Sequence, residues 1–182
     1  MKKTILTYGL LSGAVISVLM ATTVPFAHKI GFGNGLLVGY TTMVLAFLLV
    51  FMGIRSYRDN AGNGHITFGR AFAVGICITL ITCVCYVVTW EIIYYNFMPH
   101  FLDEYSAYAL QKLQASGASA AAIQKQVEQM AKYKQLYSNP LSMGLMTFIE
   151  PFPVGLVITL VSAGILRKKP QVQAAQSAMA AS

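Results

Sequence analysis

Residues 71–90 read AFAVGICITLITCVCYVVTW and contain no charged side chain. A helix needs about 20 mainly apolar residues to cross the hydrocarbon core of a bilayer, because each residue advances it by about 1.5 Å. This stretch therefore predicts a helix that spans a membrane, and it sets the class of the chain around it.

Further apolar runs lie at residues 4–24, 35–54 and 141–166. Hydrophobic residues make up 56% of the 182 residues and charged residues only 10%, a composition outside the range of soluble proteins. The first run follows Lys2 and Lys3 but is longer than the apolar core of a signal peptide, so we expect it to be kept as a helix. The chain is predicted to be an all-α, polytopic membrane protein with four transmembrane helices, at about 4–24, 35–54, 70–95 and 141–167.

The positive charges lie beside the ends of the apolar runs and do not cluster on a soluble module. The net charge of +7 therefore does not indicate a nucleic-acid partner. An orientation with the amino terminus inside the cell gives the short inner segments most of the Lys and Arg, as the positive-inside rule requires. Both termini are predicted to be cytoplasmic. The inner residues would be Lys2, Lys3, Arg55, Arg58, Arg70, Arg167, Lys168 and Lys169.

The connections predict one domain over residues 1–169 and a disordered cytoplasmic tail over 170–182, which is rich in Ala, Gln and Ser. The first outer connection, 25–34, is short, so helices one and two should be antiparallel neighbours. In the inner connection, Gly62, Asn63 and Gly64 predict a turn, and Thr67 is a candidate cap for helix three.

Residues 96–139 are the one sizeable segment outside the apolar runs. They contain two amphipathic stretches and predict an extracytoplasmic helical hairpin over about 100–137, between helices three and four. The hairpin could project from the membrane or lie flat on its surface, and we favour the projecting form. The expected packing residues of its two arms are Leu113, Ile123, Val127 and Met130.

Small residues recur four apart in the apolar runs, and helices in a bilayer associate through such residues. A packing role within one bundle is favoured over a ligand path, although a stripe could also form a dimer face. The expected packing positions are Gly9, Gly13, Gly35, Gly39, Gly75 and Gly155.

The sequence Glu150-Pro151-Phe152-Pro153 interrupts the last apolar run. A carboxylate near the centre of a transmembrane helix costs about 2.5 to 3.5 kcal/mol, and each proline removes a backbone donor, so the helix should kink or restart. Glu150 could cap the restarted helix, bond across helices as a protonated acid, or form a proton or cation site. We expect it to be largely sheltered from lipid and to face helix one or three, with Glu91 in the same half of the membrane.

Residue types that support catalysis or metal binding are not arranged for either role. The three histidines lie at connections, and Cys83 and Cys85 point to different faces of one helix, so we assign no metal and no cofactor. The chain lacks a catalytic triad and a phosphate-binding loop, so we do not expect an enzyme.

Three segments resemble the domain-of-unknown-function 4199 family of bacterial membrane proteins. They are Gly53-Ile-Arg-Ser-Tyr-Arg-Asp59, Ile66-Thr-Phe-Gly-Arg-Ala-Phe72, and Asn139-Pro140 through Glu150-Pro-Phe-Pro-Val-Gly155. The resemblance runs to about Leu166. It implies four helices, a helical outer hairpin and the bacterial cytoplasmic (inner) membrane, and it implies no biochemical function.

The leading hypothesis is a non-enzymatic integral membrane protein, a scaffold or accessory subunit whose outer hairpin contacts a partner. The expected partners are the lipid bilayer and either a second copy of the chain or another membrane protein. The alternative is a small transporter or channel that uses Glu150. Four helices enclose little room for a path, so transport would require an oligomer.

Overall fold

The computed structural model describes residues 1–24 and 32–168, and the regular elements within these ranges are helices, apart from one isolated antiparallel bridge between Ile66 and Lys168. The tail predicted to be disordered, 170–182, lies outside the described residues, and so does most of the predicted short connection 25–34. The helices are α1 (Lys2–Thr23), α3 (Phe32–Ala61), α4 (Phe68–Phe97), α5 (Phe101–Ala115), α6 (Ala120–Tyr137), α7 (Pro140–Ile149) and α8 (Pro151–Leu166).

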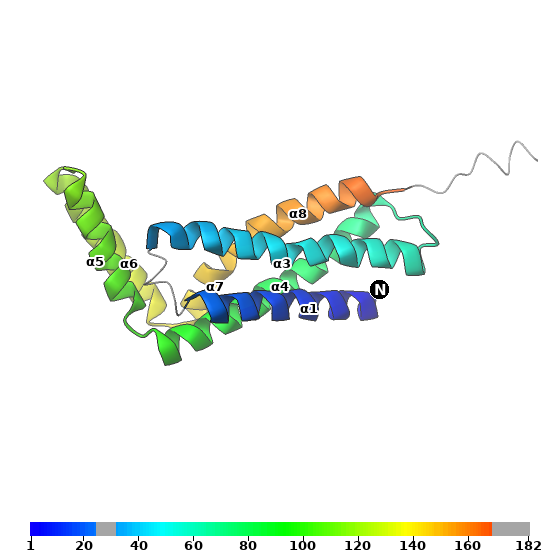
Figure 1. The fold of residues 1–182 in the computed structure, drawn as a ribbon, viewed down its shortest axis with the longest axis horizontal. Coiled ribbons are helices and arrows are strands. Elements are labelled where there is room, and N and C mark those ends of the chain that lie inside the picture. The colour runs from blue at the N-terminus through cyan, green and yellow to red at the C-terminus, as the bar shows by residue number, and fades with distance from the viewer. Residues whose placement is uncertain (25–31, 169–182) are drawn as a thin grey trace, which may run out of the picture.

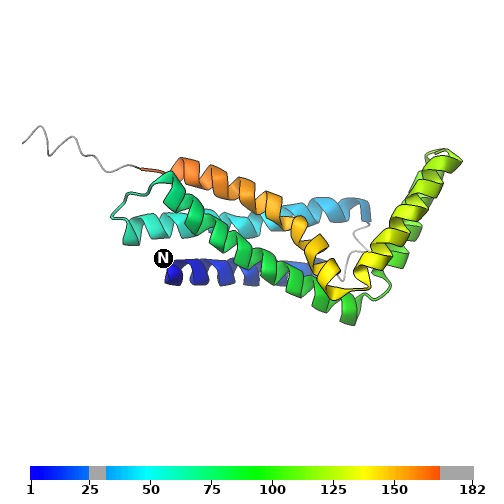
Figure 2. The same ribbon diagram turned by 180° about the vertical axis from the view of Figure 1, so that it is seen from behind.

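Four segments are long and apolar enough to cross a membrane: Lys2–Thr23, Leu37–Ala61, Phe68–Phe97 and Pro140–Leu166. They form a bundle in which α4 packs against both α1 and α8, and α3 packs against the same two helices (Figures 1 and 2). The amino terminus and the end of α8 lie at one end of this bundle. The all-α class and the four candidate membrane helices agree with the sequence prediction.

The outer surface of the bundle is apolar, as a lipid-facing surface requires and as a soluble monomer seldom shows. Exposed large side chains occur along all of the bundle helices and include Leu6, Leu10, Val18, Leu37, Leu48, Val84, Val88, Leu141, Leu145, Ile149, Val157 and Ile165.

Polar side chains in the interior bond between helices. Ser12 Oγ donates to the Ala46 carbonyl at 2.8 Å, and the hydroxyls of Thr79 and Thr159 lie 2.9 Å apart. Both contacts are buried. Hydrogen bonds of this kind, with close contacts of small residues, are what hold helices together in lipid.

Four of the predicted packing glycines make close contacts. A Cβ atom built at Gly9 would meet Ile81 at 2.9 Å, one at Gly13 would meet Cys85 at 2.5 Å, and one at Gly75 would meet Ile54 at 2.8 Å. At Gly155 it would meet Thr79 at 2.4 Å and Phe47 at 2.8 Å. The structure adds Gly53, where a Cβ would meet Ile78 at 2.5 Å.

Helix α3 continues to Ala61, beyond the predicted end at residue 54. Arg55 and Asp59, four residues apart, form an ion pair of 3.7 Å, and Arg58 Nε donates to Asp59 at 2.7 Å, so the last turns are polar but still helical. The predicted turn follows, with Asn63 and Gly64 at positive φ, and Thr67 caps α4 by accepting from the Arg70 amide.

The last membrane segment is divided into α7 and α8 at Glu150, as its prolines predict. The Thr147 carbonyl would normally accept from residue 151, which is proline. It accepts from the Glu150 amide at 3.3 Å instead, so the chain makes a tight turn and α8 begins with Pro151 at its first position.

The segment for which the sequence predicts a hairpin contains α5 and α6, here called the α5–α6 pair. The two helices lie side by side and extend away from the end of the bundle where α4 ends and α7 begins (Figure 1). Met130 is only 7% exposed, but Val127 is 42% exposed and so contributes less to the packing than predicted. Gln126 is half-buried, so it and not Val127 lies on the packed side of α6.

Candidate functional site

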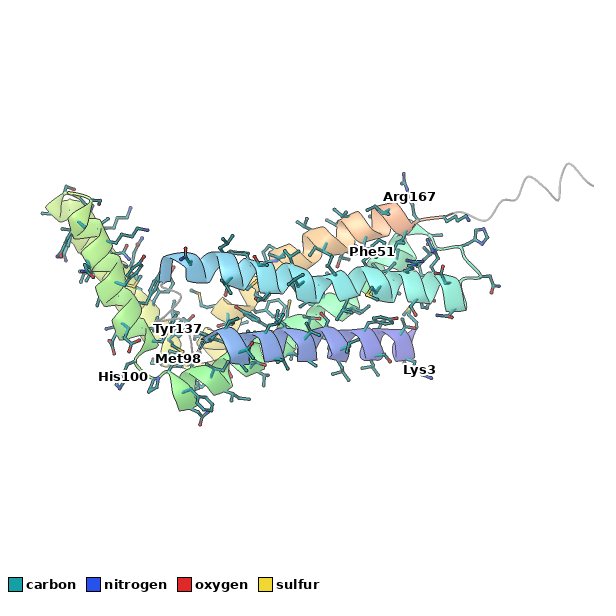
Figure 3. The ribbon with its side chains drawn as sticks, viewed as in Figure 1. Lys3, Phe51, Met98, His100, Tyr137 and Arg167 are labelled. Atoms are coloured by element: carbon teal, nitrogen blue, oxygen red, sulfur yellow. The ribbon has the colours of Figure 1, made fainter. Side chains whose placement is uncertain are left out.

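A cavity of about 510 Å³ lies where the bundle meets the α5–α6 pair. This volume is within the range of pockets that bind small molecules. Figure 3 places Tyr137, one of its lining residues, at this end of the bundle, far from Lys3 and Arg167. The lining residues come from the bundle and from the pair: Val24, Gly35, Gly39, Tyr86, Trp90, Phe101, Leu102, Tyr105, Met130, Tyr133, Tyr137, Thr147 and Glu150.

Glu150 lies on the wall of this cavity because the break between α7 and α8 places it there. Its Oε2 accepts a hydrogen bond of 2.9 Å from the Tyr86 hydroxyl on α4, the third membrane helix. It therefore faces helix three, as predicted. Glu150 occupies the N-cap position of α8 as predicted, but its side chain makes no capping hydrogen bond to that helix. Glu150 is exposed at the wall of the open cavity, and its shelter from lipid stays a prediction.

Aromatic rings form much of the cavity wall. The rings of Trp90 and Phe101 meet edge to face with centroids 5.2 Å apart, and Phe101 stacks on Tyr105 at 6.2 Å. Tyr86 is 8% exposed. Edge-to-face and offset contacts are favourable for aromatic side chains and keep the rings in a defined arrangement.

Thr147 and Tyr137 lie deep in the same wall. Thr147 is 5% exposed, and its Oγ1 has no hydrogen-bond partner among the described residues. The Tyr137 hydroxyl is near this atom but lacks the geometry of a hydrogen bond. Burial raises the pKa of Tyr137, so its phenol stays neutral at physiological pH. A buried polar atom without a partner is uncommon. This one has almost no accessible surface, so a bound group could donate to it only after the Thr147 side chain rotates.

A smaller recess of about 110 Å³ adjoins the cavity between α1 and α3. It shares Val24, Gly35, Gly39, Tyr86 and Trp90 with the main cavity. Its other lining residues are mainly apolar and are Met20, Thr23, Val38, Thr42 and Met43. The two spaces together offer a polar site with an apolar extension.

Gly35 and Gly39 correct one sequence prediction. We expected this pair to pack helices together, but a Cβ atom at either position would have no neighbour within 4 Å among the described residues. Both glycines line the cavity instead. A GxxxG pattern permits close approach of another helix but does not require it, and here the missing side chains leave open space.

The other residues of the predicted site, Glu91, Pro151 and Pro153, do not line the cavity. Glu91 is half-buried on α4 and packs against α7, where a Cβ built at Gly144 would come within 3.1 Å of Glu91 Oε1. It does not line the cavity. Pro151 is buried and Pro153 is exposed, and both act through the backbone at the start of α8. In the part of the chain that the structure describes, no three His, Cys, Asp or Glu residues gather as a metal site would need.

The aromatic wall was missed in the sequence, although a signal exists. Its six rings form three pairs spaced four residues apart: Tyr86 with Trp90, Phe101 with Tyr105, and Tyr133 with Tyr137. Residues at this spacing share one face of a helix. Three such pairs on three helices indicate three aromatic faces, but not that the faces meet.

Comparison with known proteins gives one match. A family model described as "Protein of unknown function (DUF4199)" matches residues 7–168. No curated protein and no solved structure matches the chain.

Proposed function

This chain belongs to the DUF4199 family, and we propose that it is a non-enzymatic integral membrane protein, an accessory subunit or scaffold that recognises its ligand at the α5–α6 end. The observation that carries the proposal is the cavity of about 510 Å³. Bundle and α5–α6 pair build it together, so a bound group would join the membrane part of the protein to the part outside it.

The proposed location is the bacterial cytoplasmic membrane, with both termini in the cytoplasm and the α5–α6 pair outside. The support is the charge distribution. Lys3 and Arg167 lie at the end of the bundle opposite the α5–α6 pair (Figure 3), and the polar last turns of α3 carry Arg55 and Arg58. Short positively charged segments stay on the cytoplasmic side.

Binding without catalysis fits the side chains that line the cavity. Among the described residues that line it, Glu150 is the one charged side chain, and none is a Ser, Cys or His that could act beside it as nucleophile or base. Acid–base or nucleophilic catalysis requires a partner group within hydrogen-bond reach. The chemistry available is therefore hydrogen bonding, charge and contact with aromatic rings. The expected partners are lipid and another membrane protein or a second copy, and not nucleic acid.

Transport of a cation by an oligomer is the second candidate, and the position of Glu150 on the cavity wall favours it. The close packing of the bundle interior argues against a path for an ion through a single copy. Phe47, Ile54 and Ile78 are fully buried, and Gly155 packs directly against Thr79 and Phe47. One copy with this packing would have to rearrange, or to assemble with others, before an ion could cross.

Filling the cavity tests the proposal. We would replace Gly39 by Leu, since the space beside it is open, and use Gly164→Leu as the matched control, because Gly164 is also helical, has no neighbour within 4 Å and does not line the cavity. Native mass spectrometry of the full chain, extracted from membranes in a maltoside detergent, should show bound small molecules or lipids on the wild type and on Gly164→Leu. Gly39→Leu should carry fewer.

Equal adducts on all three proteins, with all three folded, would contradict the cavity as the binding site. Ion flux in liposomes separates the second candidate. Flux that depends on the wild-type protein and stops in Glu150→Gln would support transport, whereas no flux above that of empty liposomes would leave binding alone.

A further inference from the structure

We propose that the cavity binds the primary ammonium group of an amphiphilic amine, with its apolar part in the adjoining recess. The inference rests on the proposed function and adds the chemical class of the ligand. Three features of the wall support it: its rings, its charge and its unpartnered hydroxyl.

The rings favour a cation. The six aromatic side chains of the wall are Tyr86, Trp90, Phe101, Tyr105, Tyr133 and Tyr137. The face of an aromatic ring carries negative electrostatic potential and attracts ammonium groups, most strongly where water is excluded. An aromatic belt of a membrane protein would also supply Tyr and Trp, but a belt faces the lipid boundary. Here the rings of three helices face one space with a carboxylate in its wall.

The charge of the wall is negative and also favours a cation. Glu150 is its only charged side chain among the described residues. The nearby Lys134 lines a separate hollow and forms an ion pair with Asp103, so its charge is compensated there. An anion in the cavity would meet Glu150 without a compensating cation from these residues, whereas an ammonium group would pair with it.

The hydrogen-bond acceptors distinguish a primary ammonium group from a quaternary one. Thr147 Oγ1 is buried in the wall and lacks a partner, and it lies three residues from Glu150 at the end of α7. Glu150 uses Oε2 for Tyr86 and makes no other hydrogen bond to the described residues. A primary ammonium group has three donors and can bond directly to the Glu150 carboxylate, which a quaternary ammonium group cannot. Thr147 Oγ1 has almost no accessible surface, so a second bond to it would require the Thr147 side chain to rotate toward the cavity.

The recess indicates an apolar chain beside the amine. Met20, Val38 and Met43 line it, and Tyr86 and Trp90 line both the recess and the cavity. Its volume of about 110 Å³ holds a short alkyl group. Such a ligand could be a water-soluble alkylamine or the ethanolamine headgroup of a lipid, and both present the same ammonium chemistry.

Trp90 is the single tryptophan of the chain and lines the cavity, so its fluorescence reports on occupancy without a label. The full chain in a maltoside detergent is titrated with n-hexylammonium, with n-hexanol and with hexanoate. We expect a saturable change with n-hexylammonium, and an affinity for the alcohol and the carboxylate that is weaker by about tenfold or more.

Glu150→Gln should weaken n-hexylammonium binding by about tenfold, since it removes the paired charge. The matched control is Glu91→Gln, a carboxylate on α4 outside the cavity, which should leave the affinity unchanged. Equal binding of alcohol and amine by the wild type, or equal binding by the wild type and Glu150→Gln, would overturn the ammonium class. The comparison on the wild type alone remains decisive if a variant does not fold.

The source of the amine is tested in nanodiscs. Phosphatidylethanolamine added to phosphatidylglycerol should shift the Trp90 emission and compete with n-hexylammonium if the ligand is the lipid headgroup, and should do neither if it is a soluble amine. The two proposals fail differently. Saturable hexanol binding that Gly39→Leu abolishes would refute the ammonium class and keep the cavity as a binding site. No saturable response to any probe, together with no native adducts, would refute both.

Discussion

Gly155→Ala should destabilise the bundle, and the size of the effect follows from the surroundings of this glycine. The added methyl group would lie 2.4 Å from Thr79 Cγ2, 2.8 Å from Phe47 Cε1 and 2.9 Å from Phe47 Cζ. All three distances are below normal carbon contact. Thr79 and Phe47 are both 0% exposed, so neither side chain can move toward open space.

Gly164 supplies the control on the same helix, since a Cβ atom there would have no neighbour within 4 Å. An overpacked core position costs about 1 to 3 kcal/mol, and a Gly→Ala change at an open helical position gains up to about 1 kcal/mol. The two variants should therefore differ by about 1 to 4 kcal/mol in the free energy of unfolding, with Gly155→Ala the less stable.

Unfolding of the full chain by sodium dodecyl sulfate in mixed micelles, followed through Trp90 fluorescence, measures this difference. A Gly155→Ala variant as stable as Gly164→Ala would refute the packing of α8 against α4 and α3 at this height. The helical content of both variants by circular dichroism before the titration shows that they start from the same fold.

Three further predictions concern the α5–α6 pair. The hydrogen bond and charge of Lys134 hold the pKa of Asp103 below 3.8, so this contact contributes at neutral pH and is lost as the pH falls below that value. The protection factors of the α6 amides, which are corrected for the slower intrinsic exchange at low pH, should then fall, and Asp103→Asn should remove the pH effect. Met130→Ala should destabilise the pair by about 2 kcal/mol and Val127→Ala by less than about 0.5 kcal/mol, and equal losses in protease resistance would contradict the packing. A cysteine at Ser116, with the native cysteines replaced, should react with an impermeant reagent in intact cells, and labelling only after permeabilisation would reverse the proposed orientation.

The helices follow from local sequence. The run 71–90 is apolar throughout, and it is helical and long enough to cross a membrane. Thr67 ends the preceding connection and caps α4, and Pro151 begins a new helix after the break at Glu150. Each of these features depends on residues within one or two turns, so the sequence determines them.

The glycines show where local reasoning stops. Gly35 and Gly39 have the same spacing as Gly9 and Gly13, yet only the latter pair packs closely against another helix. A glycine pattern says that a helix could approach. Whether a helix packs against that pattern depends on how the neighbouring helices are oriented in the bundle.

The candidate site depends on such long-range geometry. The sequence identified Glu150 as an unusual carboxylate and predicted that it would face helix one or three, but it placed Glu91 in the same candidate site, and Glu91 lies outside the cavity. The hydrogen bond from Tyr86 joins residues far apart in the chain. The sequence by itself determined which segments are helical, where the last one breaks and which faces are apolar, because backbone hydrogen bonding and lipid solvation act within single helices. Only the tertiary structure decided that three aromatic faces, a carboxylate and an unpartnered hydroxyl share one space, because that depends on how the α5–α6 pair meets the bundle.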